Sequence, residues 1–224
     1  MIVSGVVLAG GASRRFGSDK LAEPIDGVPL LGHALRALAG IVDEIVVVIA
    51  PDRARPELGP FGRPVRFVTD PERFGGPLVG LRTGLGAARG SVVLVVGGDM
   101  PWLVPGVLRL LVDRAPAVLA DAAGVSRPLP CTLDRATALV AADELLAVGE
   151  RRLRALLTRL EAVALARADW QGEDPGALTL VDIDERRDLS PNERDPDLAI
   201  GVSWEEEPGP VREEGDRRSR SNRA

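Results

Sequence analysis

Several chemically informative residue types are scarce in this sequence. Its 224 residues include one cysteine, one histidine and no tyrosine, and aromatic residues make up 3% of the chain. The single cysteine, Cys131, excludes a disulfide bond within the chain and fits a reducing compartment; we expect it to be a small buried residue. With so few aromatic residues, a core must be built from leucine, valine and alanine, and the hydrophobic fraction of 45% is large enough for that.

Long apolar runs and a strong basic charge are also missing. No stretch of about 18 apolar residues exists that would span a membrane. The start of the chain, MIVSGVVLAGG, lacks the charged region and the long apolar core of a signal peptide. The net charge of −5 argues against nucleic acid as a main partner. We therefore expect a cytoplasmic protein that binds neither membranes nor nucleic acids.

The glycine-rich start of the chain is its most informative stretch. Residues 2–8 form an apolar run rich in valine, which predicts a strand buried on both faces of a parallel sheet. The run ends at Gly10 and Gly11, and Arg15 and Lys20 follow closely. A glycine turn presents backbone N–H groups, which together with fixed cations suit a polyphosphate. The pattern predicts a loop that binds a nucleoside triphosphate; a plain turn followed by a solvated basic loop is the alternative.

Two better-known phosphate-binding patterns do not fit this stretch. The dinucleotide pattern G-x-G-x-x-G is absent because the glycines are adjacent, and the Walker A pattern is absent because Ser18 and Asp19 separate Gly17 from Lys20. Lys20 is nevertheless the only lysine in a chain that otherwise uses arginine. A lysine ammonium is compact and flexible enough to reach a phosphate. We interpret Lys20 as a phosphate ligand on an exposed loop, with the chance survival of one lysine as the alternative.

Apolar runs and helical patterns alternate along the rest of the chain. Strands are expected at 44–49, 65–68, 91–96, 117–120, 130–133, 162–166 and 178–183, helices at 29–39, 77–88, 105–115 and 136–148, and loops at 121–130 and 169–176. Such alternation predicts an α/β fold with a mostly parallel sheet and one antiparallel strand near Pro130. The run 91–96 is the most strand-like, so we place it at the centre of the sheet.

Three features follow predicted strands at the end where parallel sheets bind ligands. Asp70 follows the third predicted strand, and Asp99 follows two glycines after the central one. A carboxylate at the position of Asp99 suits a hard cation such as Mg²⁺, which would bridge triphosphate oxygens. Gly76 and Pro77 open a predicted helix whose first backbone groups can hold a base or a phosphate. For each feature the alternative is a plain turn, helix start or helix cap.

Residues 8–20, LAGGASRRFGSDK, resemble the signature of the molybdenum cofactor guanylyltransferases, a family of nucleotidyltransferases. The family pattern is Leu-Ala-Gly-Gly, any residue, Ser, any residue, Arg, Met or Phe, Gly, followed shortly by Asp-Lys, and every place is filled here. Further similar segments extend the resemblance to about Leu189. It implies an α/β fold with a single Rossmann-like nucleotidyltransferase domain over residues 1–190. It also implies an enzyme that transfers GMP from GTP to the phosphate of molybdopterin and releases pyrophosphate.

The resemblance also implies roles for individual residues. Arg15, Lys20 and Asp99 would be catalytic, with Asp99 as the magnesium ligand. The segment Gly-Pro-Leu-x-Gly at 76–80 matches the family segment that reads guanine. The residues expected to bind the nucleotide are Leu8, Ala9, Gly10, Gly11, Lys20, Asp70, Gly76, Pro77, Leu78, Gly80 and Asp99. Magnesium is the implied cofactor, GTP and molybdopterin are the implied substrates, and transient contacts with other cofactor-synthesis proteins are expected.

The sequence departs from the family pattern near the last predicted strand. The family has two asparagines where this chain has Asp182 and Asp184, and Ile49 stands at another place where asparagine is common. Residues two apart on a strand share a face, so one of these aspartates is a candidate second magnesium ligand; caps of the following helix are the alternative. The departures leave two other functions open. One is a related transferase that uses CTP or another phosphorylated acceptor, and the other is a non-catalytic nucleotide-binding protein.

The apolar pattern ends at about residue 190. Residues 205–224 are polar, with acidic residues first and arginines last. A segment of this composition cannot bury a core. We therefore expect residues 191–224 to form a C-terminal tail that is disordered from about residue 205.

Overall fold

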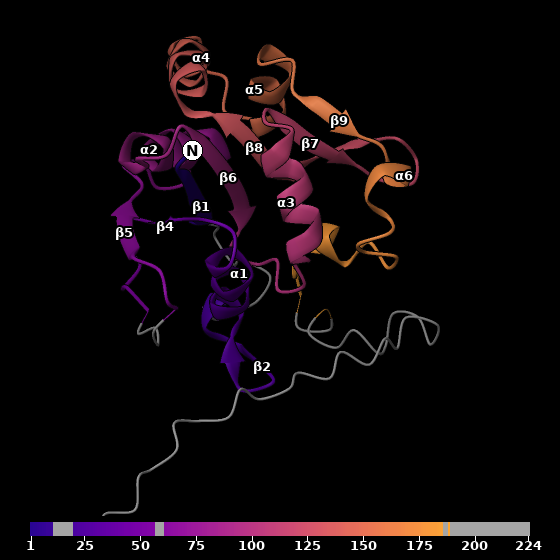
Figure 1. Ribbon diagram of the computed structural model, residues 1–224. Coiled ribbons are helices and arrows are strands. Elements are labelled where there is room, and N and C mark those ends of the chain that lie inside the picture. Colours follow the sequence, from indigo (N-terminus) through magenta and orange to yellow (C-terminus); the bar gives the residue numbers. More distant parts are fainter. Residues whose placement is uncertain (11–19, 57–60, 186–187, 189–224) are drawn as a thin grey trace, which may run out of the picture. The chain divides into compact units, whose positions relative to one another are not determined.

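A seven-stranded sheet forms the centre of the protein (Figure 1). The computed structural model describes residues 1–10, 20–56, 61–185 and 188. The strands of the sheet are β1 (Val3–Ala9), β4 (Glu44–Ile49), β5 (Val65–Thr69), β6 (Val92–Gly97), β7 (Ala117–Ala120), β8 (Ser126–Asp134) and β9 (Val163–Leu165). A separate hairpin joins β2 (Pro24–Ile25) to β3 (Val28–Pro29). None of the helices in these ranges is long and apolar enough to cross a membrane.

The strand order β5-β4-β1-β6-β8-β7-β9 confirms the expected α/β topology. β1 pairs in parallel with β4 and β6, β4 with β5, and β7 with β9. Among the described strands of this sheet, β8 alone runs against its neighbours, β6 and β7. Since β8 contains Pro130, the expected antiparallel strand is confirmed, and β6 lies in the middle of the order as the run 91–96 predicts.

Helices cover both faces of the sheet. One face packs against α2 (Pro77–Ala87), α4 (Arg135–Ala147) and α5 (Leu153–Arg159), and the other against α1 (Leu30–Ala39), α3 (Pro105–Asp113) and the short α6 (Arg167–Trp170). Neighbouring strand residues such as Val6 and Val7 belong to opposite cores, because strand side chains alternate between faces. Every residue of β4 is buried, as expected for a parallel strand covered on both sides.

The last predicted strand is wrong. Residues 178–183 form a single 3₁₀ turn, η2 (Leu178–Leu180), followed by irregular chain. The cause is Asp174, which is buried and whose carboxylate accepts the N–H groups of Leu178 and Thr179 at 3.0 and 2.8 Å. A side chain that satisfies backbone groups locally offers them an alternative to sheet pairing.

Two predicted loops are shorter than expected. β8 begins at Ser126, so the loop after β7 ends at Val125, and α6 takes up the first residues of the loop predicted at 169–176. Cys131 lies buried in β8 as expected, and burial raises the pKa of its thiol to about 12. The tail predicted at 191–224 lies outside the described residues.

A buried carboxylate joins β1, β4 and β5 near their amino-terminal ends. Ser4 Oγ donates to Glu44 Oε1 at 2.8 Å, and Arg66 Nη2 donates to Glu44 Oε2 at 2.8 Å. The backbone N–H of Arg89 donates to the same carboxylate at 2.7 Å. Burial by itself raises the pKa of Glu44, but the hydrogen bonds from Ser4, Arg89 and Arg66 outweigh it and hold the pKa below its usual value. Glu44 is thus charged in the folded protein, and its carboxylate holds the three strands together.

We expect Glu44→Gln to lower the free energy of unfolding by about 2 kcal/mol, the scale of hydrogen bonds to a charged group. Because the folded state depresses the pKa of Glu44, its stabilisation is present above the unfolded pKa and is lost as the pH falls through the folded pKa. Urea denaturation from neutral to acidic pH measures both effects. The difference between wild type and Glu44→Gln should shrink once the pH falls below 4.5.

Asp143→Asn is the matched control for this prediction, because Asp143 pairs with Arg82 at an exposed site. An exposed ion pair contributes at most about 1 kcal/mol. Equal losses in the two variants at neutral pH would contradict the anchoring role of Glu44.

Candidate active site

The carboxyl ends of the parallel strands bring the predicted site residues to one edge of the sheet. β1 and β6 are parallel neighbours and end side by side. The N–H of Gly98 donates to Leu8 O at 3.0 Å, and the N–H of Asp70 donates to Ile49 O at 2.8 Å. These main-chain bonds fix the points at which the chain leaves β5 and β6. Asp70 and Asp99 therefore lie at the same edge as Gly10, the residue that follows β1.

Lys20 and Asp99 form a largely buried ion pair at this edge. The short turn η1 (Lys20–Ala22) places the lysine against the end of β6. Lys20 Nζ donates to Asp99 Oδ2 at 2.8 Å and to Ile183 O at 2.7 Å. The Lys20 side chain is only 11% exposed and that of Asp99 is 29% exposed. The expectation that Lys20 lies on an exposed loop is therefore wrong, because the protein itself supplies two oxygen partners for the ammonium.

Two further carboxylates, Asp182 and Asp184, lie next to this ion pair. Asp184 Oδ1 is 3.7 Å from Lys20 Nζ. Partial burial raises the pKa of Asp182, and the negative charges of Asp184 and Asp99 add to the rise, while Lys20 opposes it. The backbone between the two aspartates is held by Ile183, which is fully buried and whose N–H donates to Asp99 O at 2.9 Å.

The turn at Asp184 is capped by Asp188, and not by Asp182 or Asp184. The N–H groups of Asp184 and Glu185 both donate to Asp188 Oδ2, at 3.0 and 2.9 Å. Because residues 182–184 are not a strand, the expectation that Asp182 and Asp184 share a strand face does not apply. Their role as second magnesium ligands stays a prediction.

Asp70 lies in a space that two glycines keep open. Its residue is 8% exposed, and its Oδ1 accepts the N–H of Glu72 at 3.0 Å. Within the described part of the chain, Oδ2 accepts no hydrogen bond; it faces Gly80 and Gly10, where a Cβ would lie 3.1 and 4.0 Å from it. Burial raises the pKa of Asp70. The carboxylate thus has one oxygen available to a ligand beside Gly10 and Gly80.

The first residues of α2 are fixed by the segment that contains Arg151. Gly76 has a φ of 93°, and a Cβ at this position would lie 2.9 Å from Arg151 Cβ. Pro77 occupies the first turn of the helix, and the N–H of Leu78 donates to Arg151 O at 3.1 Å. Arg151 also approaches Glu72 Oε2 at 3.5 Å. The N–H of Leu78 is therefore already used and cannot bind a base.

The structure brings ten of the predicted site residues to this edge. They are Leu8, Ala9, Gly10, Lys20, Asp70, Gly76, Pro77, Leu78, Gly80 and Asp99. Gly11 and Arg15 lie outside the described residues. The side chains of Ala9 and Leu78 are buried in the two cores, so only their backbone atoms can face a ligand.

The structure also shows two contacts that the sequence did not indicate. Arg53 Nη1 donates to Ala9 O at 3.2 Å and so supports the end of β1. Ile183 supplies a backbone oxygen to Lys20. Arg53 lies in an arginine-rich loop without a pattern that singles it out, and a backbone oxygen leaves no trace in side-chain identity.

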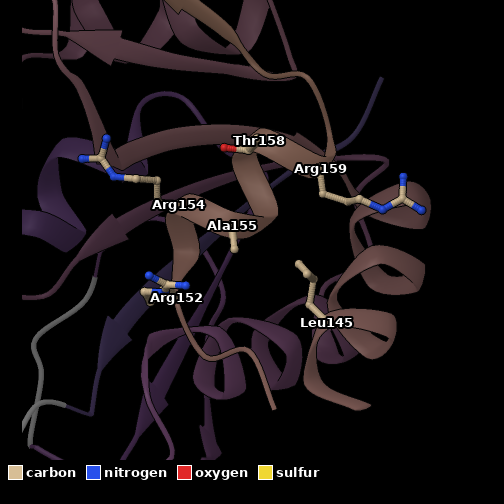
Figure 2. Close-up of a pocket in the computed structure, with 6 residues that line it drawn as sticks. All are labelled: Leu145, Arg152, Arg154, Ala155, Thr158 and Arg159. Carbon is tan, nitrogen blue, oxygen red and sulfur yellow. The ribbon is translucent and has the colours of Figure 1, made fainter. Parts of the chain in front are cut away.

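A hollow of about 420 Å³ lies elsewhere, between α4 and α5 (Figure 2). It is lined by Leu145, Arg152, Arg154, Ala155, Thr158 and Arg159. In Figure 2, Arg154 and Arg159 extend away from Ala155 in opposite directions. Arg152 and Arg159 form ion pairs with Glu150 and Glu144. None of the predicted site residues lines this hollow.

Comparison with known proteins establishes the family. The model of the MobA-like NTP transferase domain matches residues 5–164. The chain belongs to the MobA-like NTP transferase family. It is therefore a nucleotidyltransferase, as the glycine-rich start and the strand-end aspartates suggest.

Relatives of this MobA-like chain carry consistent names. A probable molybdenum cofactor guanylyltransferase of Chloroflexus aggregans is 35% identical and covers 84% of this chain and 92% of its own length. A molybdenum cofactor guanylyltransferase of Burkholderia vietnamiensis is 40% identical over 75% of this chain and 87% of its own. Molybdopterin-guanine dinucleotide biosynthesis protein A of Archaeoglobus fulgidus shares the fold, with a TM-score of 0.67, 21% identity, and coverage of 83% and 94%.

Gly76→Ala should destabilise the start of α2. A positive φ costs an alanine about 1–3 kcal/mol, and the new Cβ would also crowd Arg151 at 2.9 Å. Urea denaturation measures the loss. Gly40→Ala is the control, since Gly40 has a φ of −85° and a Cβ added there would have nothing within 4 Å; it should be neutral or slightly stabilising. Similar losses in both variants would show that α2 does not need the special backbone at Gly76.

Lys20→Arg keeps the charge but should lower the free energy of unfolding by about 1–3 kcal/mol. The guanidinium is larger and planar, and it must enter a buried space fitted to an ammonium, so its cost is that of overpacking. Thermal and urea denaturation measure the loss. Arg36→Lys, at an exposed position of α1, is the control and should change stability by less than about 0.5 kcal/mol. An unchanged stability in Lys20→Arg would show that the pocket around the ammonium is loose.

Proposed function

We propose that this nucleotidyltransferase transfers GMP from GTP to the phosphate of molybdopterin and releases pyrophosphate. The names of its relatives support this reaction, since proteins 35% and 40% identical to it over most of its length are called molybdenum cofactor guanylyltransferases. The observation that carries the proposal is the meeting of Lys20, Asp99 and Asp70 at the edge of the sheet where Gly10 follows β1.

The triphosphate is assigned to the end of β1. The sequence pattern predicts backbone N–H groups for the phosphates after Gly10, and Lys20 holds an ammonium at the same edge. Gly11 and Arg15 belong to this proposal on the basis of the sequence pattern. Fixed donors of this kind hold the phosphates in line for attack on the α-phosphorus, and positioning of reactants is a large part of catalysis in such reactions.

The oxygen donors around Asp99 suit a magnesium ion. Among the described residues no group of three or more histidines, cysteines or carboxylates is arranged to hold a metal by itself. Mg²⁺ does not need one, because it commonly binds to one or two carboxylates together with substrate phosphates. Asp99 would hold the ion. The nearby carboxylates of Asp182 and Asp184 add negative charge that would attract it. When bound, the cation would neutralise charge on the phosphates in the transition state.

The guanosine is assigned to the space between Asp70 and the start of α2. Guanine carries N–H donors next to one another, and a carboxylate with an available oxygen accepts such donors. Asp70 Oδ2 is that oxygen, and Gly10 and Gly80 leave room beside it. Gly76 and Pro77 would shape the other side of this space with backbone atoms. The proposal places the reaction in the cytoplasm, where transient contacts with other cofactor-synthesis proteins would deliver molybdopterin.

The test is transfer of labelled nucleotide to purified molybdopterin by the full chain with Mg²⁺. GTP should form the dinucleotide product and release pyrophosphate, whereas CTP and ATP should not. GTP at about 100 times its Kd should also stabilise the fold by about 2.7 kcal/mol, visible as a rise in Tm. Asp99→Asn should abolish transfer.

Other outcomes separate the alternatives. Transfer of CMP would identify a cytidylyltransferase. A rise in Tm with GTP but no transfer would indicate a nucleotide-binding protein without catalysis. The absence of both effects for every nucleotide would overturn the proposal.

A further inference from the structure

The ammonium of Lys20 already occupies a cation-binding corner of the protein. It is surrounded by Asp99 Oδ2 at 2.8 Å, Ile183 O at 2.7 Å and Asp184 Oδ1 at 3.7 Å. Its side chain is only 11% exposed, so bulk water has little access to the ammonium, whereas the side chains of Asp99 and Asp184 are 29% and 62% exposed. Two carboxylates and a carbonyl are the donors expected around a hard cation, and here a lysine fills the place.

This arrangement conflicts with binding of a divalent cation by the same carboxylate. Asp99 Oδ1 turns back against Gly97, so close that a Cβ on Gly97 would overlap it. Asp99 Oδ2 is the oxygen that faces the site, and it is the one that Lys20 holds. Two cations on one carboxylate oxygen would lie about 4 Å apart and repel each other. While the ammonium stays on Asp99, it therefore opposes the binding of a metal ion there.

We propose that Lys20 is an exchangeable internal cation, which blocks Asp99 in the free protein and releases it to a divalent cation only when a triphosphate offers the lysine new oxygen partners. This inference rests on the proposed function and adds the order in which its ligands bind. If Lys20 left Asp99 and Ile183 without a replacement, one partly buried and one buried hydrogen bond of a charged group would be broken. Phosphate oxygens supply that replacement.

The exchange makes the two ligands cooperative. The nucleotide draws Lys20 away and thereby exposes Asp99, and the cation on Asp99 prevents the return of Lys20. By linkage, each ligand raises the affinity of the other by the same factor. The free protein should therefore bind a divalent cation weakly, in spite of three neighbouring carboxylates.

The test is a titration of the full chain with Mn²⁺ in the absence of nucleotide. Electron paramagnetic resonance measures the concentration of free Mn²⁺ and so gives the affinity. Lys20→Met should bind Mn²⁺ at least about tenfold more tightly than wild type, the factor that corresponds to one hydrogen bond to a charged group. Arg53→Met is the matched control, because Arg53 carries a positive charge at the same edge but contacts Ala9 O instead of Asp99. Its effect on the Mn²⁺ affinity should stay below about threefold.

Two results would overturn the inference. One is an unchanged Mn²⁺ affinity in folded Lys20→Met, and the other is a gain that persists in the double variant Lys20→Met/Asp99→Asn. Circular dichroism establishes which variants are folded.

A second measurement uses the unaltered chain, in case Lys20→Met does not fold. Because Lys20 is the only lysine, ¹⁵N-lysine labelling gives a single side-chain ammonium signal in nuclear magnetic resonance. The signal should keep its position in millimolar Mg²⁺ alone and should move when Mg²⁺ and GTP are added together. A shift with Mg²⁺ alone, or no shift with both, would contradict the exchange.

The exchange and the proposed reaction can be contradicted independently of each other. A gain of Mn²⁺ affinity in Lys20→Met together with no GMP transfer by wild type would overturn the proposed reaction and leave the exchange standing. Transfer of GMP by a chain that shows no such gain would overturn the exchange alone.

Discussion

The parallel pairing of β1 between β4 and β6 is the constraint on which the site depends. Parallel strands end at the same edge, so Gly10 after β1, Asp70 after β5 and Asp99 after β6 lie together. The pairing requires burial on both faces, and two helical layers provide it. The Glu44 network joins the amino-terminal ends of β1, β4 and β5. The fold thus fixes the site through its backbone before any side chain of the site contributes.

The sequence predicts the strands and the strand-end aspartates well because their signals are local. In the run EIVVVI at 44–49 every residue after the first is apolar, and the run forms β4 with the same bounds. Asp70 and Asp99 are recognisable because each is an acidic residue one to three positions after an apolar run, at the point where a turn or loop begins. Strand ends, turns and helix starts are determined by neighbouring residues, so short stretches of sequence are enough to predict their positions.

The remaining features depend on contacts between distant residues, which no local pattern reveals. Residues 178–183 alternate like a strand, but Asp174 caps them into a turn. Lys20 reads as an exposed basic residue, yet Asp99 and Ile183, far along the chain, bury its ammonium. In both cases a polar side chain satisfies groups that solvent or a sheet would otherwise satisfy. Such choices are decided by tertiary packing rather than by propensity.

The charge balance around Asp99 connects these buried contacts to the departures from the family pattern. Among the described residues, Asp99, Asp182 and Asp184 share one ammonium, that of Lys20. Burial is the main cause of the raised pKa of Asp182, and the negative charges of Asp184 and Asp99 add to it, since crowded carboxylates hold protons more tightly. Asparagines at these two places would carry no charge and would create no such excess. Under the proposed function, a triphosphate approaching this corner would be repelled unless cations accompanied it, so the two aspartates would make the reaction depend more strongly on Lys20 and on a divalent cation.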